Sequence, residues 1–443
     1  MGGQGRTHDF VAVGVGPFNL GLACLVEPVR EIDGIFLESK DEFEWHGGML
    51  LEGAEIQTPF MGDLVTLADP TSPYSFLNYL KERGRLYSFY IRTSLFPLRA
   101  EFNDYCRWAA GKLDSVRFGH RVVSIDHDPD EGVHVVTAVV TATGEVTRVR
   151  GRKLVLGTGT TPNVPSAVDG ADPGDEVVHT SRYLHAKQEL LRKNSITVVG
   201  SGQSAAEVYL DLLRNTASDS CQVNWVTRSP RFFPLDYTRL TLEMTSPDYL
   251  DYFFSLPQRV KDELVSRHSP LYKGISDSLI TEIFDVLYAR SVTGPPPGRL
   301  LTNSELVAVA RDGNDHVLTL RQVEEGREYA LRTEALVLGT GYGYHVPDFL
   351  APLRDRIRWD DRGRFVVSRN YSIDSAGGEI FVQNAELHTH GFVAPDLGMA
   401  AYRNSCIIRE LLGREHYPIE RSVTFQEFAA PRGVVGHPER THR

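Results

Sequence analysis

The sequence predicts an α/β protein of two domains, with the second domain inserted into the first. A chain of 443 residues exceeds the size at which one hydrophobic core keeps growing. Two short apolar strands each run into a glycine-rich turn, at residues 10–22 and again at residues 195–207. A buried apolar strand that ends in Gly-Thr-Gly also occurs twice, at residues 153–160 and 335–342. These repeats indicate two related α/β units.

The first glycine-rich turn has the features of a dinucleotide site. Gly14 permits the tight turn, and Gly16 lets the backbone approach a pyrophosphate that the following helix N-terminus would bind. Asn19 stands where the usual motif has its third glycine, so an ordinary strand, turn and helix is the alternative. Glu38 ends the strand at residues 35–37, where a carboxylate can accept hydrogen bonds from both hydroxyls of an adenosine ribose. Together these features favour a dinucleotide.

Several regular elements are expected between this turn and the first Gly-Thr-Gly strand. A turn at residues 69–73 predicts a helix from Tyr74 to Gly84, and a second helix is expected from Glu101 to Gly111. Residues 116–140 alternate as strands around an Asp-Pro-Asp-Glu-Gly turn. The loop at residues 45–49 begins with Trp-His, which could pack on a flat ring system or belong to an ordinary core.

The second glycine-rich turn is a cleaner dinucleotide motif. Gly200 and Gly202 match its first two glycines, and Ala205 supplies the third small position. The next strand ends in Thr227 and Arg228, where a site for NAD would place an acid. An arginine there can hold a 2′-phosphate, which favours NADPH, although Arg228 could also be a surface cation.

The order of these motifs sets the expected domain boundaries. Residues 8–190 and 336–430 would form a first Rossmann-like domain for one dinucleotide. Residues 191–335 would form the inserted NADPH domain. The catalytic gap is expected between the two domains.

Composition excludes several classes of partner. The net charge of −11 argues against nucleic acid and anionic membranes, and no apolar run is long enough to cross a membrane. The four cysteines are scattered singly, without disulfide or metal-ligand spacing, which fits a cytoplasmic setting and no metal site. A disulfide reductase needs two neighbouring thiols, so electron transfer and oxygen insertion remain, and we favour oxygen insertion.

Several segments of the chain together match one known family. They are Gly14-Val-Gly16-Pro17-Phe-Asn19-Leu, Trp45-His46, Gln57-Thr-Pro-Phe60, Asp63-Leu-Val-Thr66, residues 70–80, residues 200–207 and Leu338-Gly-Thr-Gly-Tyr342. In these segments the chain resembles the flavin-dependent N-hydroxylating monooxygenases of siderophore biosynthesis, a family that includes L-ornithine, L-lysine and diamine N-hydroxylases.

The resemblance implies FAD, NADPH and O2, with a C4a-hydroperoxyflavin whose distal oxygen is attacked by a neutral primary amine. No catalytic nucleophile is expected, because the cofactors carry the chemistry. The positions that would face FAD are Gly14, Gly16, Pro17, Asn19, Glu38, Trp45, His46, Gln57 and Arg99. The positions that would face NADPH are Gly200, Gly202, Gln203, Ser204 and Arg228. The resemblance also implies a homo-oligomer, expected to be a tetramer.

Two substrate positions depart from the amino-acid hydroxylases that the chain resembles. Gly62 falls where those enzymes carry a lysine that pairs with the substrate α-carboxylate, and Leu242 falls where they carry an asparagine. Both losses favour a diamine without a carboxylate, namely putrescine or cadaverine. The alternatives are an L-lysine N6-monooxygenase in which another cation replaces the lysine, and a flavin NADPH oxidase or electron carrier.

Overall fold

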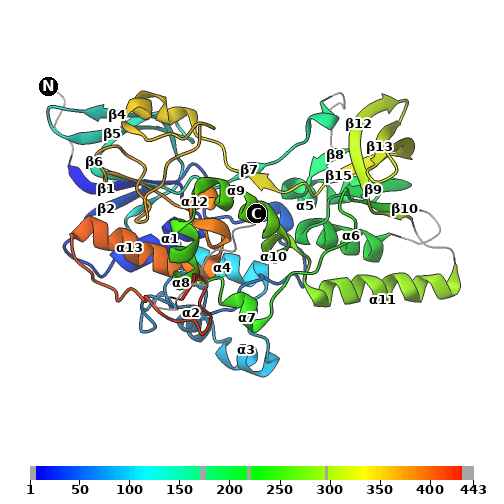
Figure 1. Cartoon of the computed structure of the whole chain (residues 1–443), viewed down its shortest axis with the longest axis horizontal. Helices are drawn as coiled ribbons and strands as arrows, with labels where there is room; N and C mark the ends of the chain where they lie inside the picture. The colour runs from blue at the N-terminus through cyan, green and yellow to red at the C-terminus, as the bar shows by residue number, and fades with distance from the viewer. Residues whose placement is uncertain (1–5, 170–175, 217–220, 295–297, 432–443) are drawn as a thin grey trace, which may run out of the picture.

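The protein has two halves, each built around a β-sheet with parallel strands at its centre (Figure 1). The computed structural model describes residues 6–169, 176–216, 221–294 and 298–431. The predicted α/β class with two domains is confirmed, because a seven-stranded sheet and a five-stranded sheet form separately.

The first sheet contains the first glycine-rich turn at the end of its central strand. Its order is β3-β2-β1-β6-β5-β4, and β17 also pairs with β6. The hairpin of β4 and β5 extends it with antiparallel pairing, as the alternation over residues 116–140 predicts. Its strands are β1 (Thr7–Val13), β2 (Gly34–Leu37), β3 (Val116–Arg117), β4 (His120–Asp128), β5 (Val133–Val140), β6 (Val146–Leu156) and β17 (Ile380–Val382).

Both faces of this sheet are buried, which explains why β1 is apolar from Phe10 to Val13. Successive side chains point to opposite faces, so Phe10 and Ala12 join one core cluster while Val11 and Val13 join another. The first cluster lies under α1 (Pro17–Val26), α4 (Arg99–Ala110) and α13 (Ala400–Leu412). The second lies under the 3-10 helix η4 (Asp348–Arg356) and the segment that follows it.

The second sheet is entirely parallel, in the order β11-β10-β9-β15-β8. Its strands are β8 (Val177–His179), β9 (Ser195–Val199), β10 (Gln222–Val226), β11 (Leu300–Leu301) and β15 (Ala335–Leu338). One face packs on α5 (Tyr183–Leu190), α6 (Gln203–Asn215) and α11 (Asp277–Thr293). The other face packs on an antiparallel sheet of β12 (Ser304–Asp312), β13 (Asp315–Gln322) and β14 (Arg327–Thr333).

Strand pairing places the inserted unit differently from the boundaries expected at residues 191 and 335. β8 precedes residue 191, yet it pairs with β15 in the second sheet. β15 itself extends beyond residue 335 to Leu338. The sequence did not reveal this because a three-residue strand carries too little periodicity to be recognised.

The chain passes between the halves through two short strands that pair with each other. β7 (Thr161–Pro162) and β16 (Tyr342–Gly343) follow the two Gly-Thr-Gly segments and are antiparallel. The remaining helices are α2 (Phe76–Glu82), α3 (Leu86–Arg92), α7 (Arg239–Leu242), α8 (Pro247–Ser255), α9 (Gln258–Arg267), α10 (Ser269–Lys273) and α12 (Leu387–His390). Within the described ranges, every helix is too short or too polar to cross a membrane.

Candidate active site

The first glycine-rich turn leaves the N-terminus of α1 open to a ligand. Gly14 has φ +86°, and a Cβ atom there would overlap the carbonyl oxygen of Gly157. Gly16 precedes Pro17 at the start of α1, where no side chain caps the helix. A Cβ atom on Gly16 would meet nothing within 4 Å. The free backbone N–H groups and the space above them fit a pyrophosphate.

Two polar side chains hold this turn from different sides. Glu38 accepts a hydrogen bond from the backbone N–H of Val15 at 2.7 Å and remains partly exposed. Asn19 is fully buried, and its Nδ2 donates to the carbonyl oxygen of Gly14 at 2.7 Å. Its Oδ1 accepts from Nε2 of Gln383 at 2.6 Å. The side chain of Asn19 therefore braces the turn from the interior, whereas the sequence-based expectation directed it toward a cofactor.

The second turn repeats this arrangement at the start of α6. Gly200 has φ +141°, and a Cβ atom there would overlap the carbonyl oxygen of Gly339. No side chain caps α6 at Gly202. The hydroxyl oxygens of Ser201 and Ser229 lie 3.2 Å apart, which brings the exposed Arg228 beside the turn. This arrangement fits a second dinucleotide with a phosphate near Arg228.

A cavity of about 280 Å³ lies between the two halves and brings together residues from both. Seven of the predicted site residues line it: Trp45, His46, Gln57, Arg99, Gln203, Ser204 and Leu242. The glycines of the two turns, Glu38 and Arg228 do not line it. Elongated dinucleotides would be anchored at the turns, and their reactive rings would have to reach this cavity.

A hydrogen-bonded network crosses the cavity wall from one half to the other. Both Nη atoms of Arg99 donate to the carboxylate of Glu207 at 2.7 Å, and Nη1 also donates to the carbonyl oxygen of Met49. Nε2 of Gln203 donates to Glu207 at 3.0 Å, and Oε1 of Gln203 accepts from Nε2 of Gln57 at 3.1 Å. The charge of Arg99 is therefore compensated by Glu207 rather than offered to the cavity.

An aromatic wall stands beside this network. The ring centroids of Trp45 and His46 lie 4.8 Å apart, and those of His46 and Tyr342 lie 5.5 Å apart. The backbone N–H of Trp45 donates to Oδ1 of Asn103 on α4, which fixes the loop. His46 is exposed toward the open cavity, and desolvation by the surrounding side chains together with the charge of Arg99 lowers its pKa. His46 is therefore neutral at physiological pH.

Gly62 does not line the cavity. It is buried behind Thr58, whose Cγ2 a Cβ atom on Gly62 would overlap. That Cβ atom would also lie 3.2 Å from Cα of Gly398. The packing of Thr58 and Gly398 fills the space beside Gly62, and the expected contact between Gly62 and substrate stays a prediction. Leu242 does line the cavity, on α7.

Known proteins resemble the chain over nearly its whole length. The family described as L-lysine 6-monooxygenase/L-ornithine 5-monooxygenase matches residues 6–344. A putrescine N-hydroxylase of Shewanella oneidensis is 47% identical over 95% of this chain and 84% of its own length. The chain belongs to this monooxygenase family.

Two solved structures extend the similarity to the fold. One is the FAD-bound cadaverine monooxygenase of the desferrioxamine pathway from Erwinia amylovora, with 50% identity, a TM-score of 0.94 and coverage of 96% of this chain and 99% of the other. The other is an ornithine N-hydroxylase of Kutzneria sp. 744 with reduced FAD, NADP+ and L-ornithine. Its identity is 30%, its TM-score is 0.85, and the match covers 93% of this chain and 100% of the other.

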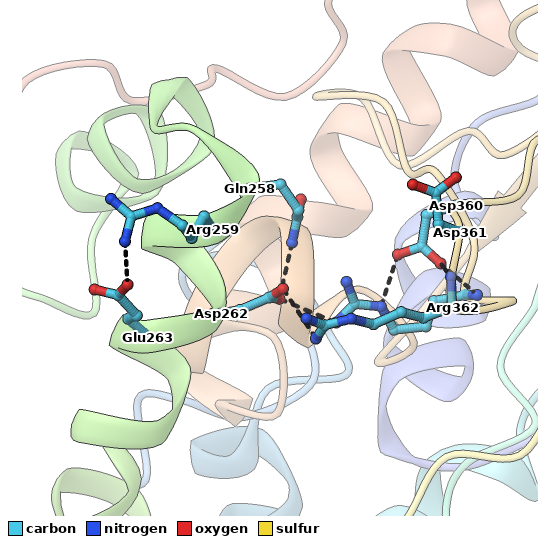
Figure 2. A pocket seen from close by; sticks show the side chains of 8 residues that line it. Gln258, Arg259, Asp262, Glu263, Asp360, Asp361 and Arg362 are labelled. Atoms are coloured by element: carbon cyan, nitrogen blue, oxygen red, sulfur yellow. Dashed lines mark hydrogen bonds and ion pairs between the residues drawn. The ribbon is translucent and has the colours of Figure 1, made fainter.

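A larger depression in this monooxygenase family member is not part of the site. It has a volume of about 510 Å³ and lies between α9 and the loop at residues 360–364 (Figure 2). Asp262 pairs with Arg362 and with Arg364, each at 3.0 Å, and Arg364 also pairs with Asp360 at 2.7 Å. Figure 2 shows Asp262 and Arg362 directed at each other across the gap. Because these charged side chains pair with one another, we interpret the network as a link between α9 and the loop at residues 360–364 and not as a ligand site.

Sequence reasoning missed several residues that line the cavity or lie close to it. Glu207 follows Gln203 by one helical turn, so the i, i+4 spacing could have indicated a pair. Lys273 lies near the second turn, where burial and the charge of Arg228 lower its pKa. Asp236 and Asp396 line the cavity from distant segments, and no local pattern marks them.

Thiols and metal-ligating groups offer no competing centre. All four cysteines are buried and unpaired. Within the described ranges, no three His, Cys, Asp or Glu side chains are arranged to hold a metal ion.

Proposed function

We propose that the protein is an FAD- and NADPH-dependent monooxygenase that hydroxylates one primary amine of an aliphatic diamine, putrescine or cadaverine. The product would serve hydroxamate siderophore biosynthesis. Support comes from the relatives that are named for these two substrates and from the charges that line the cavity.

The reaction consumes R-NH2, O2, NADPH and a proton, and it yields R-NHOH, NADP+ and water. FAD, when bound, supplies the activation of O2 after it receives a hydride from NADPH. The protein has to hold both cofactors, exclude water and keep the reacting amine neutral. A neutral His46 and a compensated Arg99 mean that neither of these two wall residues is a strong proton donor to the amine.

We propose that each turn holds one of the two cofactors. The first turn, with Glu38 at the end of the next strand, would hold FAD through its pyrophosphate and adenosine ribose. The second turn would hold NADPH, with Arg228 directed to the 2′-phosphate. Trp45, Gln57 and Gln203 line the cavity where the reactive rings would meet.

The single observation that carries the choice of a diamine is that the described residues of the cavity wall include no uncompensated cation. Among the described lining residues, Arg99 is the one permanent cation, and Glu207 neutralises it. Asp236 and Asp396 line the same cavity, so its wall is acidic. An amino acid would bring a carboxylate with no partner there, whereas a diamine brings a second ammonium, which such a wall attracts.

A hydroxylamine assay tests this function directly. The holoenzyme is supplied with NADPH, O2 and, in turn, putrescine, cadaverine, L-lysine and L-ornithine. We expect hydroxylamine from the diamines in preference to the amino acids. Hydrogen peroxide as the sole product in the presence of diamine would instead favour an NADPH oxidase, and a preference for L-lysine would favour the amino-acid hydroxylase.

We also propose a homo-oligomer, with a tetramer expected from the family resemblance, and a cytoplasmic location. On α11, Phe284, Tyr288 and Val292 follow one another at four-residue intervals and are 65%, 65% and 72% exposed. Large apolar side chains gathered on one helix face are typical of an interface. The free thiols fit a reducing compartment. Light scattering of the holoenzyme measures the oligomeric state.

A further inference from the structure

A diamine that presents one amine to the flavin must place its other amine elsewhere in the cavity. That second amine stays protonated, because nothing in the reaction needs it neutral, and a buried ammonium requires a charged partner. Two carboxylates line the cavity, those of Asp236 and Asp396. The two carboxylates differ in their surroundings, and this difference makes one of them the better partner for the second ammonium group.

Asp396 is held by a hydrogen bond to one carboxylate oxygen, and its other carboxylate oxygen is available to a ligand. It begins the 3-10 helix η6 (Leu397–Met399), where its Oδ1 accepts a hydrogen bond from the backbone N–H of Gly398 at 2.6 Å. Among the described residues, no side chain forms an ion pair with Asp396 and no donor reaches its Oδ2. A fixed carboxylate with an open oxygen in a cavity wall is suited to accept a hydrogen bond from an ammonium group.

Neighbouring residues enclose Asp396 without neutralising it. Burial raises the pKa of Asp396, and its negative charge adds to burial in raising the pKa of Tyr237 to about 12. The positive charge of Arg403 acts to lower the pKa of Asp396. The Arg403 guanidinium, however, pairs with Glu386 at 3.0 Å and donates a hydrogen bond to the carbonyl oxygen of Ala394. A bound ammonium would supply the missing positive charge and favour the ionised carboxylate.

Asp396 also lies next to the position that the sequence singled out for substrate choice. A Cβ atom on Gly62 would lie 3.2 Å from Cα of Gly398, and a Cβ atom on Gly398 would lie 3.0 Å from Oδ1 of Asp396. The wall beside Gly62 therefore carries a negative group. Tyr272 and Phe392 line the same cavity with rings stacked at 6.1 Å, and they offer apolar surface to a methylene chain.

Asp236 has the opposite character. It is exposed, and one of its oxygens accepts a 3.3 Å hydrogen bond from the backbone N–H of Thr238. Water screens an exposed carboxylate, so it contributes little to holding a cation.

We propose that Asp396 is the substrate-binding residue that holds the ammonium group of the diamine that is not hydroxylated, an inference that rests on the proposed diamine hydroxylation. Asp396 thereby sets the substrate class: it accepts a terminal cation and repels a terminal carboxylate. Asp236 provides the matched control, because it is an acid of the same cavity with an exposed side chain.

The test measures hydroxylamine formation by the FAD-loaded Asp396→Asn and Asp236→Asn variants. Substrates are putrescine, cadaverine and the monoamines n-butylamine and n-pentylamine, which lack the second ammonium. An asparagine can still accept the hydrogen bond from Gly398, so Asp396→Asn removes charge and keeps the cap. FAD content and the rate of flavin reduction by NADPH without amine report whether each variant is intact.

We expect Asp396→Asn to raise KM for both diamines about ten- to hundredfold, as is typical for loss of a charged hydrogen-bond partner. Its monoamine kcat/KM should not fall, and Asp236→Asn should change KM for diamines less than about threefold. Asp396→Glu, which keeps the charge, should restore diamine binding in part. An equal loss for diamines and monoamines would assign Asp396 a structural role and overturn the inference.

Failure of the inference is distinguishable from failure of the function. If the wild-type enzyme makes no hydroxylamine from diamines, the proposed function is wrong. If the wild-type enzyme hydroxylates diamines and Asp396→Asn leaves their KM unchanged, the function stands and another group holds the second ammonium.

Discussion

The two glycine-rich turns share a backbone design and differ in the residues that surround it. In each, a glycine with positive φ packs against the glycine that follows a parallel strand, Gly14 against Gly157 and Gly200 against Gly339. The repeated sequence motifs therefore reflect a contact that occurs in both halves. Each Gly-Thr-Gly segment is far from its turn in the sequence but contacts it in space, because the strands that precede the two are paired in parallel.

The difference begins at the third small position. In the second turn Ala205 fills it, and a Cβ atom on Gly339 would overlap that alanine. In the first turn Asn19 fills it and uses the space to hydrogen-bond Gly14 and Gln383. An asparagine is tolerated because its polar atoms are satisfied, whereas an unsatisfied amide there would cost stability.

The second difference lies at the end of the neighbouring strand. Glu38 reaches back to the N–H of Val15 in the first turn. The second turn has the cations Arg228 and Lys273 nearby and no acid in the matching place. A carboxylate suits ribose hydroxyls and an arginine suits a phosphate, so the same backbone can serve FAD in one half and NADPH in the other.

The largest expected effect comes from a valine in either turn. Gly14→Val forces a β-branched residue into positive φ and into the carbonyl of Gly157, so we expect a protein without bound FAD. Gly200→Val makes the matching change in the other half, so it should retain FAD and lose flavin reduction by NADPH. Flavin absorbance per protein and stopped-flow reduction measure the two outcomes.

Circular dichroism of both valine variants checks that each remains folded. A folded Gly14→Val variant with full FAD would contradict the assignment of the first turn. Loss of FAD from both variants alike would show that the turns do not divide the cofactors.

A smaller effect is expected at the end of β10. Arg228→Ala removes a charged partner of the 2′-phosphate, at a cost of about 1.5 to 3 kcal/mol, so KM for NADPH should rise roughly ten- to hundredfold. KM for NADH should change little, because NADH lacks that phosphate. Arg231→Ala is the matched control, since Arg231 is an exposed cation on the same segment that stacks over Phe233. Equal losses for both coenzymes would assign Arg228 to the surface.

Local features of the fold were predictable from the sequence, and features that depend on distant packing were not. The strand before Gly14, the helix after it and the hairpin at residues 116–140 follow from side-chain period and turn residues. Helix bounds moved by a residue or two, as at α4, which begins at Arg99 rather than at Glu101.

Cavity residues illustrate why the rest could not be read from the sequence. Thr58 and Gly62 are close neighbours in the sequence, but Gly62 meets Gly398 only because segments more than 300 residues apart pack together. Whether Gly62 opens into the cavity or lies behind Thr58 depends on that packing, and a motif cannot report it. Asp396 was missed for the same reason, since its importance comes from what surrounds it.

The last prediction uses Gly62 to add a positive charge beside the acidic wall of the cavity. Gly62→Lys would place an ammonium group near Asp396, where it would compete with the substrate for the carboxylate and repel the substrate's own charge. Two like charges about 4 Å apart repel by roughly 4 kcal/mol at an effective dielectric near 20, and solvent and lysine flexibility reduce this to about 1 to 3 kcal/mol. KM for the diamine should therefore rise by about tenfold or more, with FAD content unchanged.

Steric crowding has to be separated from charge in that variant, because any side chain at Gly62 overlaps Thr58. Gly62→Ala introduces the same overlap without the charge, so we expect it to raise KM for putrescine and cadaverine much less than Gly62→Lys does. Equal increases would mean that crowding, rather than charge, excludes the substrate. A further sign of charge would be an increase in turnover of L-lysine or L-ornithine by Gly62→Lys alone, limited by Leu242, which offers no polar partner to an amino acid. If charge decides the outcome, the acidic wall of this cavity distinguishes a diamine from an amino acid, whereas the two turns distinguish one dinucleotide from the other.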